Sequence, residues 1–152
     1  MMKSAILTFL MAMVPVIELR GAIPFGVVNG LSIPAAFIIS VIGNLAPIPF
    51  AVVFTRKILE WLQTKSKTLD KFVKWLERKA EKNSEKVLRS EFWGLMILVA
   101  IPLPGTGAWT GALVAAMLDM RLKRSMPAIT LGVIIAGIIV TVITYGAGAL
   151  FF

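Results

Sequence analysis

Two blocks of apolar sequence dominate the chain, and each opens with a broken segment and ends with a longer uninterrupted run. The arms of the broken segments are about 10–14 residues long, so as helices they reach about 15–21 Å at about 1.5 Å per residue. A hydrocarbon core of about 30 Å is thicker than that. The pattern therefore predicts an all-α integral membrane protein with two short-armed segments and two full spans. The segments are 4–31 and 92–118, and the transmembrane helices are 32–55 and 125–150.

The polar breaks divide the short-armed segments near their middles. Residues 18–21 (Glu-Leu-Arg-Gly) form the first break and residues 102–107 form the second. Each segment is either one kinked span or a re-entrant hairpin whose tip lies inside the membrane. If segment 92–118 crossed fully, the positive charges of Arg121 and Arg124 would lie outside, against the positive-inside rule. The re-entrant form is therefore preferred for both segments.

Between the two blocks lies a charged stretch, residues 56–91, with 11 Lys/Arg and 6 Asp/Glu. Its apolar residues recur at intervals of three and four, which predicts an amphipathic helix, or two helices with a break near 64–68. A basic amphipathic helix favours the surface of an anionic leaflet, so this linker is expected to be cytoplasmic and to contact membrane lipids. Nucleic-acid binding is disfavoured, because Glu and Lys alternate and no groove-reading motif is present.

The two blocks resemble each other in the positions of their prolines. Pro15 and Pro102 are 87 residues apart at the breaks, and Pro34 and Pro127 are 93 apart at the starts of the long runs. A hairpin followed by one span crosses the membrane once, so a second copy would be inverted, which is a common transporter plan. The alternative is that proline and glycine are simply frequent in membrane helices. The predicted organisation is a first repeat over 1–55, the linker 56–91 and a second repeat over 92–152.

Composition supports a membrane protein and argues against an enzyme. The chain has 58% hydrophobic residues, 16% charged residues and a mean hydropathy of +0.87, with neither histidine nor cysteine. Histidine is the commonest general base and metal ligand, and its absence removes the usual intramembrane protease arrangements. The apolar start also continues through Glu18 and Arg20 with no signal-peptide cleavage site. We expect no catalytic residues, no metal and no cofactor.

Charges at membrane depth are costly and usually functional, which singles out Glu18 and Arg20. The second arm of each hairpin should point its positive N-terminal end at the break, where an anion is favoured. Pro24 suits the first turn of one arm, and Thr106 could cap the other. The alternative is a structural ion pair between Glu18 and Arg20 that locks the tip.

Two motifs carry a family resemblance. Val14-Pro15-Val16-Ile17-Glu18-Leu19-Arg20-Gly21-Ala22-Ile23-Pro24 and Pro102-Leu103-Pro104-Gly105-Thr106-Gly107-Ala108-Trp109-Thr110-Gly111 resemble the breaks of the small multidrug export protein family. More distantly, the plan is similar to the DedA superfamily. These resemblances imply a multi-pass protein of the prokaryotic inner membrane. The DedA likeness also implies transfer of polyprenyl phosphates by embedded acidic and arginine residues. Glu18 and Arg20 would take those roles, and Arg121 and Arg124 are the nearest candidates for a second arginine pair.

Three functions follow as hypotheses. The first is a flippase for an anionic amphiphile such as a polyprenyl phosphate, with Glu18 carrying a coupling proton. The second is an exporter of hydrophobic cations with Glu18 as counter-charge, and the third is a non-transporting membrane scaffold. The candidate site residues are Glu18, Arg20, Gly21, Pro104, Gly105, Thr106, Gly107, Arg121 and Arg124.

A second copy of the chain is also an expected partner. Four crossing or dipping elements bury little, and break loops at membrane depth need cover by protein. Small residues spaced four apart let helices approach closely. We therefore expect a homodimer with Gly26 and Gly30, or Gly107 and Gly111, near a helix contact.

Overall fold

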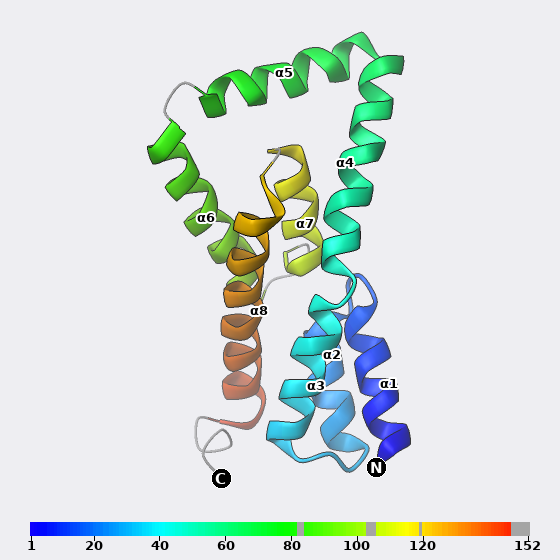
Figure 1. The fold of residues 1–152 in the computed structure, drawn as a ribbon. Coiled ribbons are helices and arrows are strands. Elements are labelled where there is room, and N and C mark those ends of the chain that lie inside the picture. Colours follow the sequence, from blue (N-terminus) through cyan, green and yellow to red (C-terminus); the bar gives the residue numbers. More distant parts are fainter. Residues whose placement is uncertain (82–83, 103–105, 119, 147–152) are drawn as a thin grey trace.

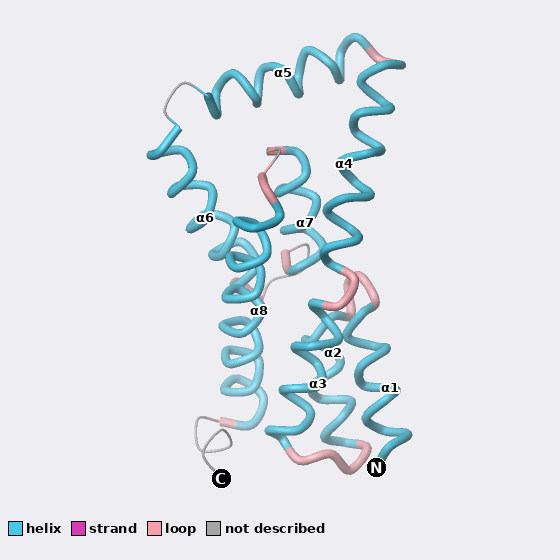
Figure 2. Tube along the Cα trace, in the orientation of Figure 1, coloured by secondary structure: helices cyan, strands magenta, loops and turns pink. Residues whose placement is uncertain are grey.

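The computed structural model describes residues 1–81, 84–102, 106–118 and 120–146, and in these ranges every regular element is a helix. Figures 1 and 2 show helices joined by short turns. In chain order they are α1 (Met2–Met13), α2 (Glu18–Val28), α3 (Ile33–Leu45), α4 (Ile48–Lys65), α5 (Lys67–Glu81), α6 (Ser84–Ala100), α7 (Ala108–Met117) and α8 (Leu122–Tyr145). The stretches Ile33–Lys65 and Leu122–Tyr145 are long and apolar enough to cross a membrane. An all-helical chain with two such stretches agrees with the predicted class.

The first short-armed segment folds as a hairpin of α1 and α2, and both helices pack on α3 (Figure 1). Its turn lies at residues 14–17, one turn earlier than the predicted break at 18–21. Pro15 explains the shift, because the residue before a proline is driven out of the α region, and Val14 is extended with ψ 129°. Glu18 therefore begins α2, and Pro24 lies inside that helix rather than in its first turn.

Helices α6 and α7 form the second hairpin, with α6 packed along α8 and α7 placed against α4 (Figure 1). Helix α6 begins at Ser84, well before the predicted start at 92. The N-cap of α7 is Gly107, and it makes no side-chain capping bond, so the prediction that Thr106 caps this helix is wrong. Gly107 has φ +126°, a conformation that glycine adopts at no steric cost.

The two long runs differ in their continuity. The predicted span 32–55 consists of two helices, because Pro47 and Pro49 lack the N–H groups that would continue the α3 ladder. Helix α4 then runs on to Lys65 and takes in the first ten residues of the predicted linker. Helix α8 is continuous from Leu122 to Tyr145, although the predicted run ended at 150. Residues 147–152 lie outside the described part of the chain.

The remainder of the predicted linker is α5 and the start of α6, and the break expected near 64–68 falls at Ser66. Helix α5 lies across one end of the molecule, opposite the end where the N-terminus and the last described residues of α8 lie (Figure 1). Phe72 and Trp75 stack on each other along it, 45% and 49% exposed. A helix placed crosswise with exposed aromatic residues agrees with the predicted amphipathic helix.

Small residues allow helices to pack closely in both halves of the bundle. A Cβ added to Gly43 of α3 would lie 2.5 Å from the Phe9 carbonyl oxygen of α1. A Cβ added to Gly132 of α8 would lie 2.7 Å from the Met96 carbonyl oxygen of α6. The same close approach of a glycine to a backbone carbonyl therefore recurs at the α1–α3 and α6–α8 contacts.

The glycines expected at a dimer contact pack within the chain instead. A Cβ on Gly26 would meet Thr8 and Ala36, and one on Gly111 would meet Val99 of α6. Gly107 faces Glu18, whereas Gly30 is exposed with nothing within 4 Å of an added Cβ. Gly26, Gly107 and Gly111 thus lie at close contacts within the chain, while the homodimer and the helix contact that joins it stay predictions.

Candidate functional site

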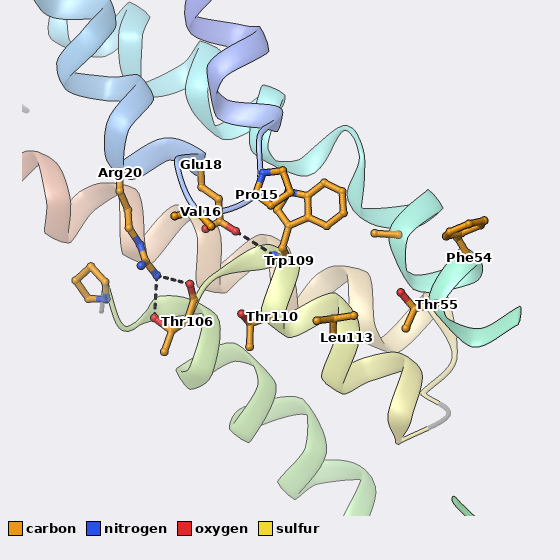
Figure 3. Close-up of a pocket in the computed structure, with 12 residues that line it drawn as sticks. Pro15, Val16, Glu18, Arg20, Phe54, Thr55, Thr106, Trp109, Thr110 and Leu113 are labelled. Atoms are coloured by element: carbon orange, nitrogen blue, oxygen red, sulfur yellow. Dashed lines mark hydrogen bonds between the residues drawn. The ribbon is translucent and has the colours of Figure 1, made fainter. Parts of the chain in front are cut away.

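The turns of the two hairpins meet near the middle of the molecule, and the side chain of Arg20 links them (Figure 3). Its Nη2 donates to the carbonyl oxygen of Thr106 at 2.7 Å and to the Thr106 hydroxyl at 2.8 Å. It also donates to the carbonyl oxygen of Ile101 at 3.3 Å. Helix α6 ends at Ala100, so the Ile101 oxygen lies at the negative end of its dipole, and the Thr106 hydroxyl is hydrogen-bonded to that oxygen. A guanidinium is well matched to that end.

Glu18 makes the complementary contact at the start of α7. Its Oε1 accepts a hydrogen bond from the Trp109 backbone N–H at 3.1 Å, and the Ala108 N–H also hydrogen-bonds the carboxylate. The Glu18 side chain is almost fully buried. The first N–H groups of a helix have no partner within it, and the positive end of the dipole favours an anion there. An anion was predicted at this helix end, and the structure places the chain's own carboxylate there.

Gly107 is the residue against which the Glu18 carboxylate packs. A Cβ at this position would collide with Glu18 Oε2 and lie 2.9 Å from its Cδ. Together with its φ of +126°, this close approach explains why glycine stands at the start of α7. The glycine in the break of the second hairpin therefore leaves room for the Glu18 carboxylate of the first hairpin.

Trp109 adds a third link between the hairpins, and it was not among the predicted site residues. Its indole Nε1 donates to the carbonyl oxygen of Met13, the last residue of α1, at 3.1 Å. Buried indole N–H groups usually find such a partner. The sequence signal was a single aromatic residue in a break motif that otherwise consists of proline, glycine, alanine, threonine and one leucine.

A pocket of about 580 Å³ opens beside this joint, between α4 and α7 (Figure 3). Its lining is mainly apolar and aromatic, with Glu18, Arg20 and three threonines as the polar groups. The lining residues are Pro15, Val16, Glu18, Arg20, Ala51, Phe54, Thr55, Pro102, Thr106, Trp109, Thr110 and Leu113. Small-molecule sites are typically apolar clefts of about 300–1,000 Å³ with a few polar groups. The size and lining of this pocket fit an amphiphilic small molecule.

The structure brings together only part of the predicted site. Glu18, Arg20, Thr106 and Gly107 meet at the joint, whereas Gly21 packs against Ile17 and does not line the pocket. Pro104 and Gly105 lie outside the described residues.

The two predicted arginines lie apart from the joint. Arg121 and Arg124 follow the far end of α7, and ten helical residues separate that end from Glu18 by about 15 Å. Arg121 is exposed, and Arg124 lies near Glu91 of α6. Burial raises the pKa of the Glu91 carboxyl, and the Arg124 guanidinium opposes that rise. These arginines belong to the α5 end of the molecule.

Two helical stretches long and apolar enough to cross a membrane, with a buried carboxylate beside a mainly apolar pocket, agree with the class of integral membrane proteins. Residues 18–139 match the family model described as "Putative small multi-drug export protein", and the chain belongs to that family. The family prediction from the two break motifs is confirmed. No curated protein and no solved structure matches the chain. The more distant similarity to the DedA superfamily stays a prediction.

Proposed function

We propose that the protein exports amphiphilic small molecules, with hydrophobic cations as the preferred class, through the pocket between α4 and α7. The observation that carries this proposal is the pocket itself, where an acidic side chain lies among apolar and aromatic residues. Phe54 and Trp109 offer ring faces that attract cations, and Glu18 offers a counter-charge. Drug export is also the activity that the family description names.

The same contacts argue against an anion as the preferred substrate. Arg20 already donates to oxygens of Ile101 and Thr106, and the N-terminal end of α7 holds the Glu18 carboxylate. An anion would have to displace one of these contacts. The flippase of anionic amphiphiles is kept as a second candidate, because Arg20 lines the pocket.

We further propose a placement in the membrane. Helices α1, α2 and α7 have 12, 11 and 10 residues, and at about 1.5 Å per residue none is long enough to cross about 30 Å of hydrocarbon. The hairpins would be re-entrant from opposite sides, with their tips meeting near the midplane. Helix α5 would lie on the cytoplasmic surface, because it crosses the end of the molecule that carries the lysine-rich segment. The recurring Gly43 and Gly132 contacts support an inverted repeat.

Transport of a labelled lipophilic phosphonium cation in proteoliposomes tests the preferred function. We expect the native protein to bind and move it, and Glu18→Gln to lose at least tenfold in binding because the counter-charge is gone. Glu60→Gln is the matched control, since Glu60 is exposed on α4 away from the pocket. Native protein that neither binds nor moves the cation would refute the proposal, as would full activity of a folded Glu18→Gln variant.

The same liposomes distinguish the second candidate and the scaffold. If a polyprenyl phosphate is the substrate, Arg20→Gln should abolish its translocation, whereas Arg121→Gln should leave it intact because Arg121 lies away from the joint. A protein that moves neither probe while remaining folded and assembled would favour the scaffold hypothesis.

The proposed placement has its own test, which the absence of native cysteine makes direct. A single cysteine introduced at residue 122 should react with a membrane-impermeant maleimide only from the cytoplasmic side. Reaction only from outside would overturn the re-entrant placement of the second hairpin.

A further inference from the structure

The pocket between α4 and α7 is polar at one end and apolar at the other. Figure 3 shows Arg20 and Thr106 at one end of its lining and Phe54 at the opposite end. Among the described residues that line it, only Glu18 and Arg20 carry a charge, and both lie at the hairpin tips. An occupant therefore meets charge at the tips and apolar side chains further along. This order fits a molecule with one polar head and an apolar body.

The edge of the pocket is apolar and strongly exposed. Three exposed side chains form its rim: Val16 of the α1–α2 turn is 90% exposed, Phe54 of α4 is 65% exposed and Leu113 of α7 is 48% exposed. The apolar surface continues along α4, where Phe50 is 77% exposed. Large exposed apolar patches mark surfaces that meet another apolar phase, and in a membrane the hydrocarbon core is one. The rim therefore suits contact with lipid chains rather than with water.

In the proposed placement the rim also lies at hydrocarbon depth. The hairpin tips are then near the midplane, and the hydrocarbon extends about 15 Å to either side. Phe54 is six residues beyond the start of α4 at Ile48, and Leu113 is five residues beyond the start of α7 at Ala108. At about 1.5 Å per residue, neither is more than about 9 Å along its helix from the tips. The edge of the pocket thus lies within the hydrocarbon and not among the lipid headgroups.

A hydrogen bond joins the two walls of the pocket at the end nearer α5. Arg56 follows the lining residue Thr55 on α4, and its Nη2 donates to the carbonyl oxygen of Met120, just after α7. A path along α4 and α7 toward the cytoplasm therefore passes a hydrogen-bonded guanidinium, whereas the rim offers an uncharged opening. An amphiphile that enters across the rim does not have to displace a charged contact.

We propose that the rim is a lateral mouth that opens the pocket to the hydrocarbon core, and that the substrate enters from the bilayer as a dissolved amphiphilic cation. Its positive head lies toward Glu18 and its apolar body toward Phe54 and Leu113. Partition into the bilayer raises the concentration of such a molecule at the mouth about fourfold for each added CH₂ group. This route deepens the proposed function and rests on it, although the mouth can be measured without a ligand.

A nitroxide spin label at residue 113 tests the mouth in liposomes, because the chain has no native cysteine. The label on Leu113→Cys should be relaxed by oxygen, which concentrates in hydrocarbon, and not by a water-soluble nickel chelate. A saturating lipophilic phosphonium cation should lower the oxygen effect at least twofold, because it fills the mouth. Ile97→Cys is the matched control, since Ile97 is 53% exposed near the end of α6 and does not line the pocket. The cation should leave its oxygen effect unchanged.

Association kinetics test the route. At a fixed aqueous concentration, the association rate of phosphonium cations should rise about fourfold for each CH₂ group added to their chains. Leu113→Trp narrows the mouth and should slow association at least fivefold. Ile97→Trp adds the same side chain at an equally exposed position away from the pocket, and it should associate at the native rate.

Three results would overturn the lateral mouth. They are relaxation of the residue 113 label by the nickel chelate rather than by oxygen, association rates that are independent of chain length, and native association in folded Leu113→Trp. Disulfide bonds between two Val16→Cys chains, with little oxygen at residue 113, would show instead that a second copy covers the rim. Failure to bind phosphonium with an oxygen-accessible residue 113 would refute the proposed function and the route with it. An aqueous residue 113 in a protein that moves the cation would refute the mouth alone.

Discussion

The two hairpins have similar plans but unequal charge. The α1–α2 hairpin carries Glu18 and Arg20 at the start of α2, whereas the described residues between α6 and α7 carry no charged side chain. The uncharged hairpin supplies helix ends instead, a negative one at α6 and a positive one at α7. The charges and the dipoles are complementary, so the buried Glu18 and the half-buried Arg20 are bound by backbone groups and one threonine hydroxyl rather than by charged side chains of the second hairpin. In this chain, therefore, one hairpin supplies the charged side chains and the other supplies the helix ends that bind them.

The first prediction concerns the α6–α7 hairpin, where a substitution should cause the largest loss of stability. Gly107→Ala places a Cβ against the Glu18 carboxylate and forces alanine to a φ of +126°. Overpacking and backbone strain together should cost about 3–5 kcal/mol and lower the Tm sharply. The control is Gly94→Ala, where a Cβ has open space on a helix and should stabilise by up to about 1 kcal/mol. Similar Tm values for both variants would disprove the Gly107 fit.

The second prediction removes a charge from the donating hairpin. Arg20→Ala leaves the α6 end without its cation and Glu18 without a nearby positive charge, so it should destabilise the fold by about 3 kcal/mol. Arg20→Lys should restore only part of this, because an ammonium cannot reproduce the fork of donors. Thermal unfolding of the native protein, Arg20→Ala, Glu18→Gln and the double variant gives a double-mutant cycle for the interaction between the two residues. Strictly additive losses would show that the two charges do not act as a unit.

Loss of the tryptophan link should have a smaller effect. Trp109→Phe keeps an aromatic ring in the pocket but removes the N–H that donates to Met13, which should cost about 1 kcal/mol. Trp93→Phe is the control, since Trp93 is 56% exposed and its ring meets Phe92 edge to face. Equal Tm values for the two variants would mean that the Met13 contact does not help join the hairpins.

The smallest effect is expected away from the joint, at Glu91. Its pKa is raised by burial despite the nearby Arg124 guanidinium, so the protonated form is favoured in the folded state. Its contribution to stability is therefore fully present below the unfolded pKa and is lost as pH rises through the folded pKa. Glu91→Gln should raise the Tm slightly at pH 7, and this gain should disappear on acidification toward pH 4. A lower Tm at pH 7 would show that the pairing with Arg124 dominates.

Much of the fold followed from the sequence because apolar run lengths and prolines act locally. The helical class and the turn at Ser66 are confirmed, and the arrangement of re-entrant hairpins stays a proposal. The boundaries were less accurate, since a proline stops a helix before itself, and Pro15 therefore moved the break to residues 14–17. The transmembrane run was predicted to end at 55, where the charged residues begin, and a separate amphipathic helix was expected to follow. Helix α4 instead continues to Lys65, because charged residues end the apolar portion of a helix and not the helix itself.

The site was harder to predict because its contacts join residues far apart in the chain. Glu18 and Arg20 stood out as charges in apolar sequence, but their partners lie 81–91 residues away. Backbone donors and acceptors leave no mark on the sequence, so an external anion was assigned to a helix end that Glu18 occupies.

The meeting of the hairpin tips also bears on how such a protein could be assembled from separate genes. The segment through α5 is the covalent tie between the α1–α4 and α6–α8 halves, while Arg20, Glu18 and Trp109 tie them without a covalent bond. A gene cut near the codon for Ser66 would yield two membrane-inserted fragments that still carry complementary tips. Each fragment would then identify its partner by charge and helix polarity, and the linker would set their stoichiometry rather than their recognition.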